Sequence, residues 1–306
     1  MASKSEVAGY PADFGENMRL IRFGDKNAET PGLLLGGIRK DISAVMRELG
    51  FVDFNHRFFT DNGLVKLHQT LQEYDQRRLP DVDDNVRWAA PVARPGKVVC
   101  IGLNYADHAR EAGTPLPVEP ILFLKASNAV VGPYDDVLIP RGSTQTDWEI
   151  ELGVVVGRDA RYLRTIEEAA EHIAGYCISH DVSERAFQHE RGGQWTKGKS
   201  CDTFNPLGPW VATAREIQQV GNLSMSLTVN GAVRQQGNTA TMIFNATYLV
   251  HYVSQFMTLE AGDVLTTGTP SGVGASRTPP QYLKSGDVVE LSIDHLGVQR
   301  QRFINA

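Results

Sequence analysis

One short segment constrains the fold of this chain more than any other, because it places three acidic residues in what is otherwise a strand. Asp147, Glu149 and Glu151 alternate in the stretch TDWEIELGVVVG, which continues as an apolar run through residues 152–156. Side chains alternate between the two faces of a strand, so the three carboxylates are predicted to share one face. A divalent cation would offset their mutual repulsion and their lost hydration beside apolar residues. A solvated face on an edge strand is the alternative.

A second predicted strand supplies one more acidic candidate. Residues 175–179 are apolar and lead to Asp181. Asp181 could add a third metal carboxylate from a neighbouring strand, or it could be the N-cap of a helix beginning at Val182. In such a helix, Arg185 and Gln188 would lie near the face of Asp181 and would face a bound anion. A site made only of carboxylate oxygens favours Mg²⁺, Mn²⁺ or Ca²⁺ over zinc.

The overall composition excludes several classes of protein. The chain of 306 residues is 42% hydrophobic and carries a net charge of −6, which argues against nucleic-acid binding. No apolar run reaches the roughly 18 residues that a membrane span requires. The chain contains 3 cysteines, an odd number, and their spacing does not match that of metal ligands. Such cysteine usage favours the reducing cytoplasm. We therefore expect a cytoplasmic protein that binds neither nucleic acid nor membranes.

Predicted strands outnumber predicted helices, and the chain lacks the strand–helix alternation of a doubly wound sheet. Short strands are predicted in residues 18–41, helices at 42–50 and 63–78, and a proline-rich linker at 80–95. The fold class is therefore α+β and β-rich. The expected parts of the chain are a disordered extension at 1–17, a small N-terminal α/β domain at 18–90 and a larger domain at 91–306.

Later segments carry clear local signals. A capping box at Thr165 begins a helix that is predicted to run to about residue 173. Asn230–Gly231 is a strong hairpin signal between two strands. The remaining predictions are a helix at 244–256 and a closing β pair formed by 287–293 and 298–303.

His108 and Glu111 form a candidate catalytic pair. They lie three residues apart in the segment NYADHARE, so a helical turn would place them on one face. A carboxylate beside an imidazole raises its basicity and selects its tautomer, as a water-activating base requires. An exposed helix pair without catalytic function is the alternative.

Residues 193–200 match the phosphate-binding pattern G-x-x-x-x-G-K-[ST], but their context is wrong. Such a loop follows a buried strand and begins a helix. Here a polar, charged segment precedes the motif, and Pro206 limits any helix after it. We therefore predict no nucleotide site. Lys199 could stabilise developing negative charge from a mobile glycine-rich loop, or it could be a solvated lysine.

A second glycine-rich loop, at residues 268–274, follows a predicted strand. Its glycines would let the backbone approach a ligand closely and offer N–H donors to a carboxylate. A plain tight turn is the alternative.

Taken together, these segments resemble the fumarylacetoacetate hydrolase superfamily over residues 97–303. The subgroup that the chain resembles most comprises hydrolases of 2,4-diketo-3-deoxy-L-fuconate or L-rhamnonate. The matching motifs are IGLNY with His108 and Glu111, Glu119-Pro120 with Phe123-Leu124-Lys125, D-x-E-x-E-L-G from Asp147, D-x-x-x-R-x-x-Q from Asp181, Trp195-Thr196 with Lys199-Ser200, and Thr267-Gly268-Thr269-Pro270 with Gly272-Val273-Gly274.

The resemblance implies a catalytic domain built as a mixed β-sandwich roll and a homodimer. The founding fumarylacetoacetases carry a further aspartate ligand upstream of the histidine. Ile101 stands in that place here, so three protein ligands are expected. The implied roles are Mg²⁺ or Mn²⁺ ligation by Glu149, Glu151 and Asp181, water activation by His108 and Glu111, polarisation of the substrate by Lys199, and substrate contact by Arg185, Gln188 and Thr269.

The implied reaction is hydrolysis of the C3–C4 bond of a 2,4-diketo acid. His108 would take a proton from water as the water attacks the C4 carbonyl, giving pyruvate and a hydroxy acid such as lactate. Acylpyruvate hydrolysis, oxaloacetate decarboxylation, hydroxy-dienoate isomerisation and ureidoglycolate cleavage would suit a similar site. A P-loop nucleotide-binding protein and a non-enzymatic, metal-stabilised β protein are alternatives from other classes.

Overall fold

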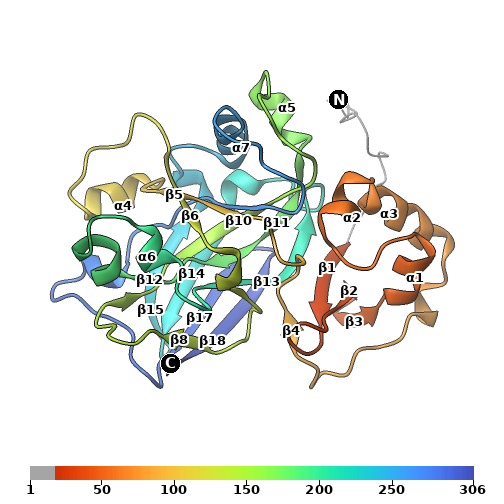
Figure 1. Ribbon diagram of the computed structural model, residues 1–306, viewed down its shortest axis with the longest axis horizontal. Coiled ribbons are helices and arrows are strands. Elements are labelled where there is room, and N and C mark those ends of the chain that lie inside the picture. The colour runs from red at the N-terminus through yellow and green to blue at the C-terminus, as the bar shows by residue number, and fades with distance from the viewer. Residues whose placement is uncertain (1–17) are drawn as a thin grey trace.

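The computed structural model describes residues 18–306, so the predicted extension at 1–17 lies outside the described residues. An eleven-stranded sheet runs through most of the molecule (Figure 1), in the order β3-β2-β1-β13-β11-β10-β16-β5-β6 with β4 beside β1 and β7 beside β13. Its strands are β1 (Arg19–Phe23), β2 (Thr30–Leu35), β3 (Ile38–Asp41), β4 (Trp88–Ala89), β5 (Val98–Gly102), β6 (Ile121–Lys125), β7 (Val130–Val131), β10 (Ile150–Val156), β11 (Ile173–His180), β13 (Asn205–Thr213) and β16 (Val264–Thr266).

A second sheet of five strands packs on one face of the first, in the order β15-β14-β17-β18-β8. The predicted hairpin is confirmed, because Asn230–Gly231 joins β14 to β15. The predicted closing β pair is confirmed as β17 and β18. The strands are β8 (Val137–Ile139), β14 (Ser224–Val229), β15 (Ala232–Asn238), β17 (Val288–Ile293) and β18 (Gly297–Asn305), and a separate two-stranded sheet pairs β9 (Thr146–Asp147) with β12 (Ser183–Glu184).

The helices are short and lie around the sheets. The predicted helix start at Thr165 is confirmed, since its Oγ1 accepts a hydrogen bond from the Glu168 N–H at 3.1 Å, whereas the Glu168 carboxylate accepts from the Arg164 N–H at 2.7 Å and not from that of Thr165. That helix ends at Ala170 and does not reach residue 173, because strand β11 begins at Ile173. The α-helices are α1 (Ser43–Glu48), α2 (His56–Thr60), α3 (Gly63–Glu73), α4 (Ala106–Glu111), α5 (Ile166–Ala170), α6 (Thr196–Lys199) and α7 (Ala246–Ser254), with a π-helix at Ala186–Glu190.

Two of these helices differ from the expectation. The predicted helix at 63–78 ends at Glu73, and a separate 3-10 turn forms at Gln76–Arg78. The helix α2 was not predicted, since its five residues are too few to show a helical period. No helix within residues 18–306 is both long and apolar enough to cross a membrane.

The N-terminal region, residues 18–90, continues the large sheet of the rest of the chain. Strand β1 pairs with β13, with Leu20 opposite Val211. The segment predicted as a linker contains β4, which pairs with β1. Figure 1 shows this region in red and orange at one end of the long axis, with α1 to α3 beside β1 to β3. The boundary near residue 90 therefore stays a prediction.

Two apolar cores lie on opposite faces of the large sheet. Along β5, Val99 and Ile101 belong to the core between the two sheets, whereas Val98 and Cys100 belong to the core beneath the N-terminal helices. The alternation follows from the two-residue period of a strand. A β-rich α+β fold with two packed sheets thus agrees with the predicted fold class.

Candidate functional site

Strand register brings the acidic candidates together at the ends of neighbouring strands of the large sheet. Strands β10 and β11 are antiparallel, with Glu151 opposite Ser179, so the start of β10 lies beside the end of β11. The Asp181 N–H donates to the Glu149 carbonyl oxygen at 3.0 Å. Strands β16 and β5 run parallel and end at the same edge. The segments that follow β5, β11 and β16 and the segment that precedes β10 therefore converge on one place.

The carboxylates of Glu149, Glu151 and Asp181 form a single buried cluster there. Each offers an oxygen, and these oxygens lie within 4.8 Å of one another. The three residues are 5%, 1% and 0% exposed. These are the three residues that the family resemblance implied for one site, and they lie together.

Asp147 lies outside this cluster, so the prediction of three carboxylates on one face is wrong for this residue. Its side chain accepts hydrogen bonds from the N–H groups of Gly274 and Ala275, at 2.7 and 3.0 Å. The physical reason is that the strand is not continuous. Trp148 and Glu149 separate β9 from β10, and alternation between faces holds only along an unbroken strand.

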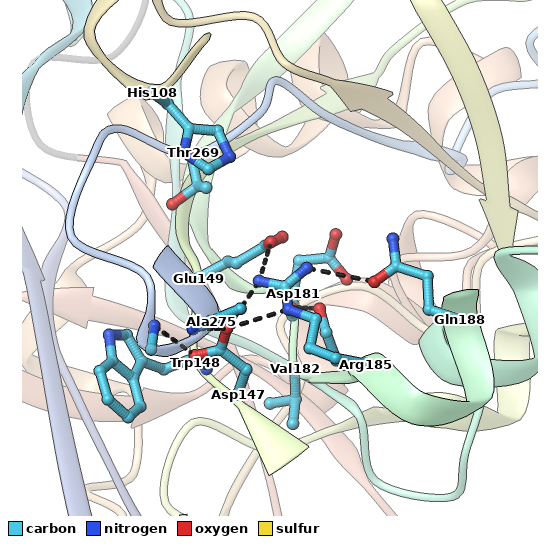
Figure 2. A network of polar contacts seen from close by, with 12 residues as sticks. His108, Asp147, Trp148, Glu149, Asp181, Val182, Arg185, Gln188, Thr269 and Ala275 are labelled. Atoms are coloured by element: carbon cyan, nitrogen blue, oxygen red, sulfur yellow. Dashed lines mark hydrogen bonds and ion pairs between the residues drawn. The ribbon is translucent and has the colours of Figure 1, made fainter. Parts of the chain in front are cut away.

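Three cationic side chains neutralise most of this negative charge. Lys199 Nζ bridges Glu149 Oε2 and Asp181 Oδ2 at 2.6 and 2.7 Å. Lys125 Nζ pairs with Asp181 Oδ1. Arg185 donates to Asp147 Oδ2 at 2.9 Å and to Glu149 Oε1 at 2.6 Å, and Figure 2 shows its guanidinium between those carboxylates.

The charge of the cluster is unevenly compensated. Burial opposes ionisation of Glu149, but Lys199 and Arg185 outweigh it and hold the pKa of Glu149 well below its usual range. Burial, followed by the charges of Asp181 and Glu149, raises the pKa of Glu151 well above its usual range. Among the hydrogen bonds of Glu151 is one from the Gly268 N–H, at 2.9 Å, and no ion pair with a described residue reaches it.

His108 and Glu111 lie on one turn of α4, as predicted. His108 Nδ1 and Glu111 Oε2 are 3.2 Å apart. The Gly272 N–H donates to Glu111 Oε1 at 2.9 Å and so fixes this carboxylate. His108 lines the same cavity as Glu149 and Glu151, which contradicts the alternative of an isolated helix pair.

The loop at residues 268–274 donates its N–H groups to carboxylates of the protein itself. Gly268, Gly272 and Gly274 each donate to a different acid, Glu151, Glu111 and Asp147. Gly268 and Gly272 have φ of +90° and +107°, which glycine adopts without strain. The loop therefore orients the acids of the site, where the sequence analysis expected it to contact a ligand.

The segment around Asp181 is not the predicted helix. Ser183 and Glu184 form β12, and the π-helix begins at Ala186. Arg185 nevertheless faces the cluster, and Gln188 Oε1 accepts a hydrogen bond from it at 3.2 Å. Asp181 is therefore part of the acidic cluster and not a helix cap.

Lys199 is 2% exposed at the end of α6, so the alternatives of a solvated lysine and of a mobile loop are wrong. Helix α6 spans only Thr196–Lys199, and a turn precedes it instead of a buried strand. The rejection of a P-loop at this motif is confirmed. Sequence reasoning quoted Lys125 without assigning it a role. The signal was present, because a lysine closes the apolar strand ILFLK and such a residue is buried only when paired.

A cavity of about 280 Å³ opens beside the cluster. Thr269, 3% exposed, lies on its wall and donates to the Ile150 carbonyl oxygen at 2.8 Å. The predicted site residues that line the cavity are His108, Glu149, Glu151, Arg185, Gln188, Lys199 and Thr269. Asp181 and Glu111 contact them from behind, through Lys199 and His108. Further residues that the sequence analysis did not place here include Phe123, His189 and Trp195.

The pattern of the fumarylacetoacetate (FAA) hydrolase C-terminal family matches residues 97–304, which contain the whole cluster and cavity. The chain belongs to this family. The match covers more than half of the chain and bears out the resemblance described above.

Several known proteins are similar to this chain over nearly their whole lengths. The 2,4-didehydro-3-deoxy-L-rhamnonate hydrolase of Sphingomonas sp. (strain SKA58) is 45% identical, over 93% of this chain and 95% of the relative. The fumarylacetoacetate hydrolase of Exiguobacterium antarcticum has a TM-score of 0.81 at 34% identity, covering 94% and 100% of the two chains. The maleylpyruvate hydrolase of Sphingobium sp. SYK-6 has a TM-score of 0.76 at 28% identity, covering 94% and 100%. These findings support hydrolase activity.

Proposed function

We propose that this family member is a divalent-metal-dependent hydrolase that cleaves the C3–C4 bond of a 2,4-diketo acid. The expected substrate is of the 2,4-diketo-3-deoxy-L-rhamnonate or -fuconate type, and the products are pyruvate and a hydroxy acid such as lactate. The observation that carries the proposal is the buried Glu149, Glu151 and Asp181 cluster, which opens into the cavity lined by His108. The name of the Sphingomonas relative supports the substrate class.

The residues of the cluster fit a divalent cation. Glu149, Glu151 and Asp181 supply oxygen donors only, which suits Mg²⁺ or Mn²⁺. No ion pair with residues 18–306 reaches Glu151, and burial together with the charges of Asp181 and Glu149 disfavours its carboxylate form, so a cation at the cluster would stabilise the charged form. A bound dication would supply positive charge where the enolate of pyruvate develops.

The chain itself supplies the proton transfer. Glu111 accepts from His108 Nδ1, which leaves Nε2 free to take a proton from water. The water oxygen bonds to C4 as the C3–C4 electron pair moves to the pyruvate fragment. The proton taken from water then returns to C3. Lys199 and Arg185 hold the carboxylates of the cluster in position through their ion pairs.

Isotope labelling tests the reaction directly. The purified protein with Mg²⁺ is expected to release pyruvate from 2,4-diketo-3-deoxy-L-rhamnonate, and in H₂¹⁸O the label is expected in the carboxylate of lactate. Oxaloacetate and a hydroxy-dienoate serve as comparison substrates. Turnover of either one, with none of the diketo acid, would replace the proposed reaction by decarboxylation or isomerisation.

We also propose that the protein is a homodimer in the reducing cytoplasm. Strand β6 is one of the edge strands of the large sheet, and it exposes Ile121 and Leu124. An exposed apolar edge strand readily pairs with another chain. The cysteines are free thiols, which supports a reducing compartment. Light scattering of the purified protein tests the dimer, and a monomeric mass would refute it.

A further inference from the structure

The cavity has an aromatic wall that the proposed chemistry does not use. The ring of Phe123 lies 5.0 Å from Lys199 Nζ, next to the acidic cluster. Trp195 meets Phe123 edge-on, with ring centroids 5.4 Å apart, and His189 meets Trp195 at 6.1 Å. The contacts thus run from the buried Lys199 to the exposed His189, that is, from the cluster to the rim.

Glycine at position 102 provides the space for this wall. A Cβ on Gly102 would lie 2.8 Å from the six-membered ring of Trp195. The indole therefore packs directly on the end of β5, which helps to hold its position. Among residues 18–306, the imidazole of His189 contacts the Trp195 ring and forms no hydrogen bond. Burial, together with Arg185 and Lys199, lowers the pKa of His189, so the ring is neutral at pH 7.

The cationic side chains that line the cavity are already paired with acids. Among the described residues that line it, these are Arg185 and Lys199. Arg185 pairs with Asp147 and Glu149, and Lys199 pairs with Glu149 and Asp181. A carboxylate at the outer end of a substrate would therefore meet Trp195 and a neutral His189, where it would lose part of its hydration without gaining a cationic partner from the cavity lining.

The charge of the ion-pair network leads to the same conclusion. Three carboxylates and three cationic side chains form this network and balance one another: Asp147, Glu149, Asp181, Lys125, Arg185 and Lys199. Glu151 lies beside them in the acidic cluster. With Glu151 as a carboxylate, a dication would leave one net positive charge, which a single substrate carboxylate neutralises.

We propose that Phe123, Trp195 and His189 form the subsite for the distal end of the substrate and select monocarboxylates with an uncharged end over dicarboxylates. The inference rests on the proposed function, which places the 2-oxo acid head at the acidic cluster. A short hydroxylated chain ending in a methyl group fits this wall, because the methyl group packs on the rings and a hydroxyl can hydrogen-bond to the neutral imidazole.

Binding of two matched compounds tests the subsite without turnover. 2-Oxopentanoate and 2-oxoglutarate share a 2-oxo acid head and differ by a methyl group against a carboxylate at the far end. Calorimetry with the Mg²⁺-loaded protein is expected to show at least tenfold tighter binding of 2-oxopentanoate. Equal or tighter binding of 2-oxoglutarate, or no binding of either compound, would overturn the proposal.

A charge introduced at the rim gives the sharper test. His189→Arg is expected to shift the binding ratio at least tenfold toward 2-oxoglutarate. His56→Arg is the control, because His56 is exposed on α2 and does not line the cavity. Equal shifts in both variants, or none in His189→Arg, would contradict the subsite. Thermal unfolding shows whether the variants are folded. Trp195→Ala gives an independent test of the subsite, because this variant is expected to bind 2-oxopentanoate at least fivefold more weakly.

The outcomes separate the two proposals. If the binding preference and its shift are found but no diketo acid is cleaved, the proposed function fails and the subsite stands. If the diketo acid is cleaved and 2-oxoglutarate binds as tightly as 2-oxopentanoate, the subsite alone fails.

Discussion

The N-terminal region and the acidic cluster use the same large sheet in opposite ways. Beneath α1 to α3, the region packs Phe51, Phe54 and Phe59 around Phe58, with ring centroids 5.0 to 5.3 Å apart. At the start of β10 and the end of β11, the buried side chains of the ion-pair network are charged and each cation contacts an acid. The first arrangement stabilises the fold by apolar burial, whereas the second holds charge in place for binding.

The comparison shows where a substitution should affect stability and where it should affect function. Removing a ring from the N-terminal region leaves a cavity and no charge. Removing a carboxylate that is ion-paired in the acidic cluster leaves its buried cationic partner without a counter-charge. Variants of the two regions should therefore separate stability from metal binding and activity.

The largest effect is expected for His108→Ala. Loss of a general base lowers kcat by about 10²–10⁴-fold, while metal binding and stability stay close to the unmodified protein because His108 is not in the cluster. Steady-state kinetics and calorimetric Mg²⁺ titration measure the two quantities. Full activity in this variant would remove His108 from its proposed role.

In the N-terminal region, Phe58→Ala is expected to lower the free energy of unfolding by about 3–5 kcal/mol. Phe58 is fully buried and contacts three other rings. Chemical denaturation measures the loss. At temperatures where the variant is folded, its kcat should be unchanged, and a large fall in kcat would show that the two regions are more tightly coupled than we propose.

Glu151→Gln is expected to separate metal binding from stability within the cluster. If Glu151 is a direct ligand, as we propose, its loss should weaken Mg²⁺ binding by more than about 100-fold. Because its neighbours and burial already disfavour the ionised form, the metal-free variant should be at least as stable as the unmodified protein. Glu149→Gln is the matched variant, and it should destabilise the protein because Lys199 and Arg185 lose a partner. Equal destabilisation by both would contradict the uneven charge of the cluster.

The smallest effect is expected at the junction of the two regions, where Arg87 pairs with Asp135 at 2.6 Å. Burial opposes ionisation of Asp135, but the Arg87 and Gly132 hydrogen bonds outweigh it and lower its pKa. The folded-state pKa lies below the unfolded value of about 3.9, so the stabilisation is present above that pH and is lost as pH falls through the folded pKa. After screening by solvent, Arg87→Met should cost about 1 kcal/mol at pH 7.

Thermal unfolding at pH 7 and at pH 3 measures this pH dependence. The difference between the unmodified protein and Arg87→Met is expected to shrink at the lower pH. Arg302→Met, which breaks an exposed pair with Asp136, is the control and should show little difference at either pH. A difference for Arg87→Met that is the same at both pH values would contradict the role of Asp135.

Local patterns in the sequence were sufficient for several elements. Asn230–Gly231 specifies its own turn, and Thr165 caps its own helix, so neither prediction depended on distant residues. Glu149 directly precedes β10 and Glu151 lies at its start, and the two carboxylates belong to one cluster. Motif order then connected them with Asp181 and His108, since a resemblance to a family carries spatial information that spacing alone lacks.

Tertiary structure decided what each charge does. The break between β9 and β10 turned Asp147 away from the cluster, and long-range ion pairs buried Lys125 and Lys199. The aromatic wall joins segments that lie far apart in the chain, because strand pairing and packing bring Phe123 and Trp195 together. Residue types and short spacings determine local conformation and which groups can ionise. The partners that set their charge and contacts come from distant segments, so only the folded chain determines them.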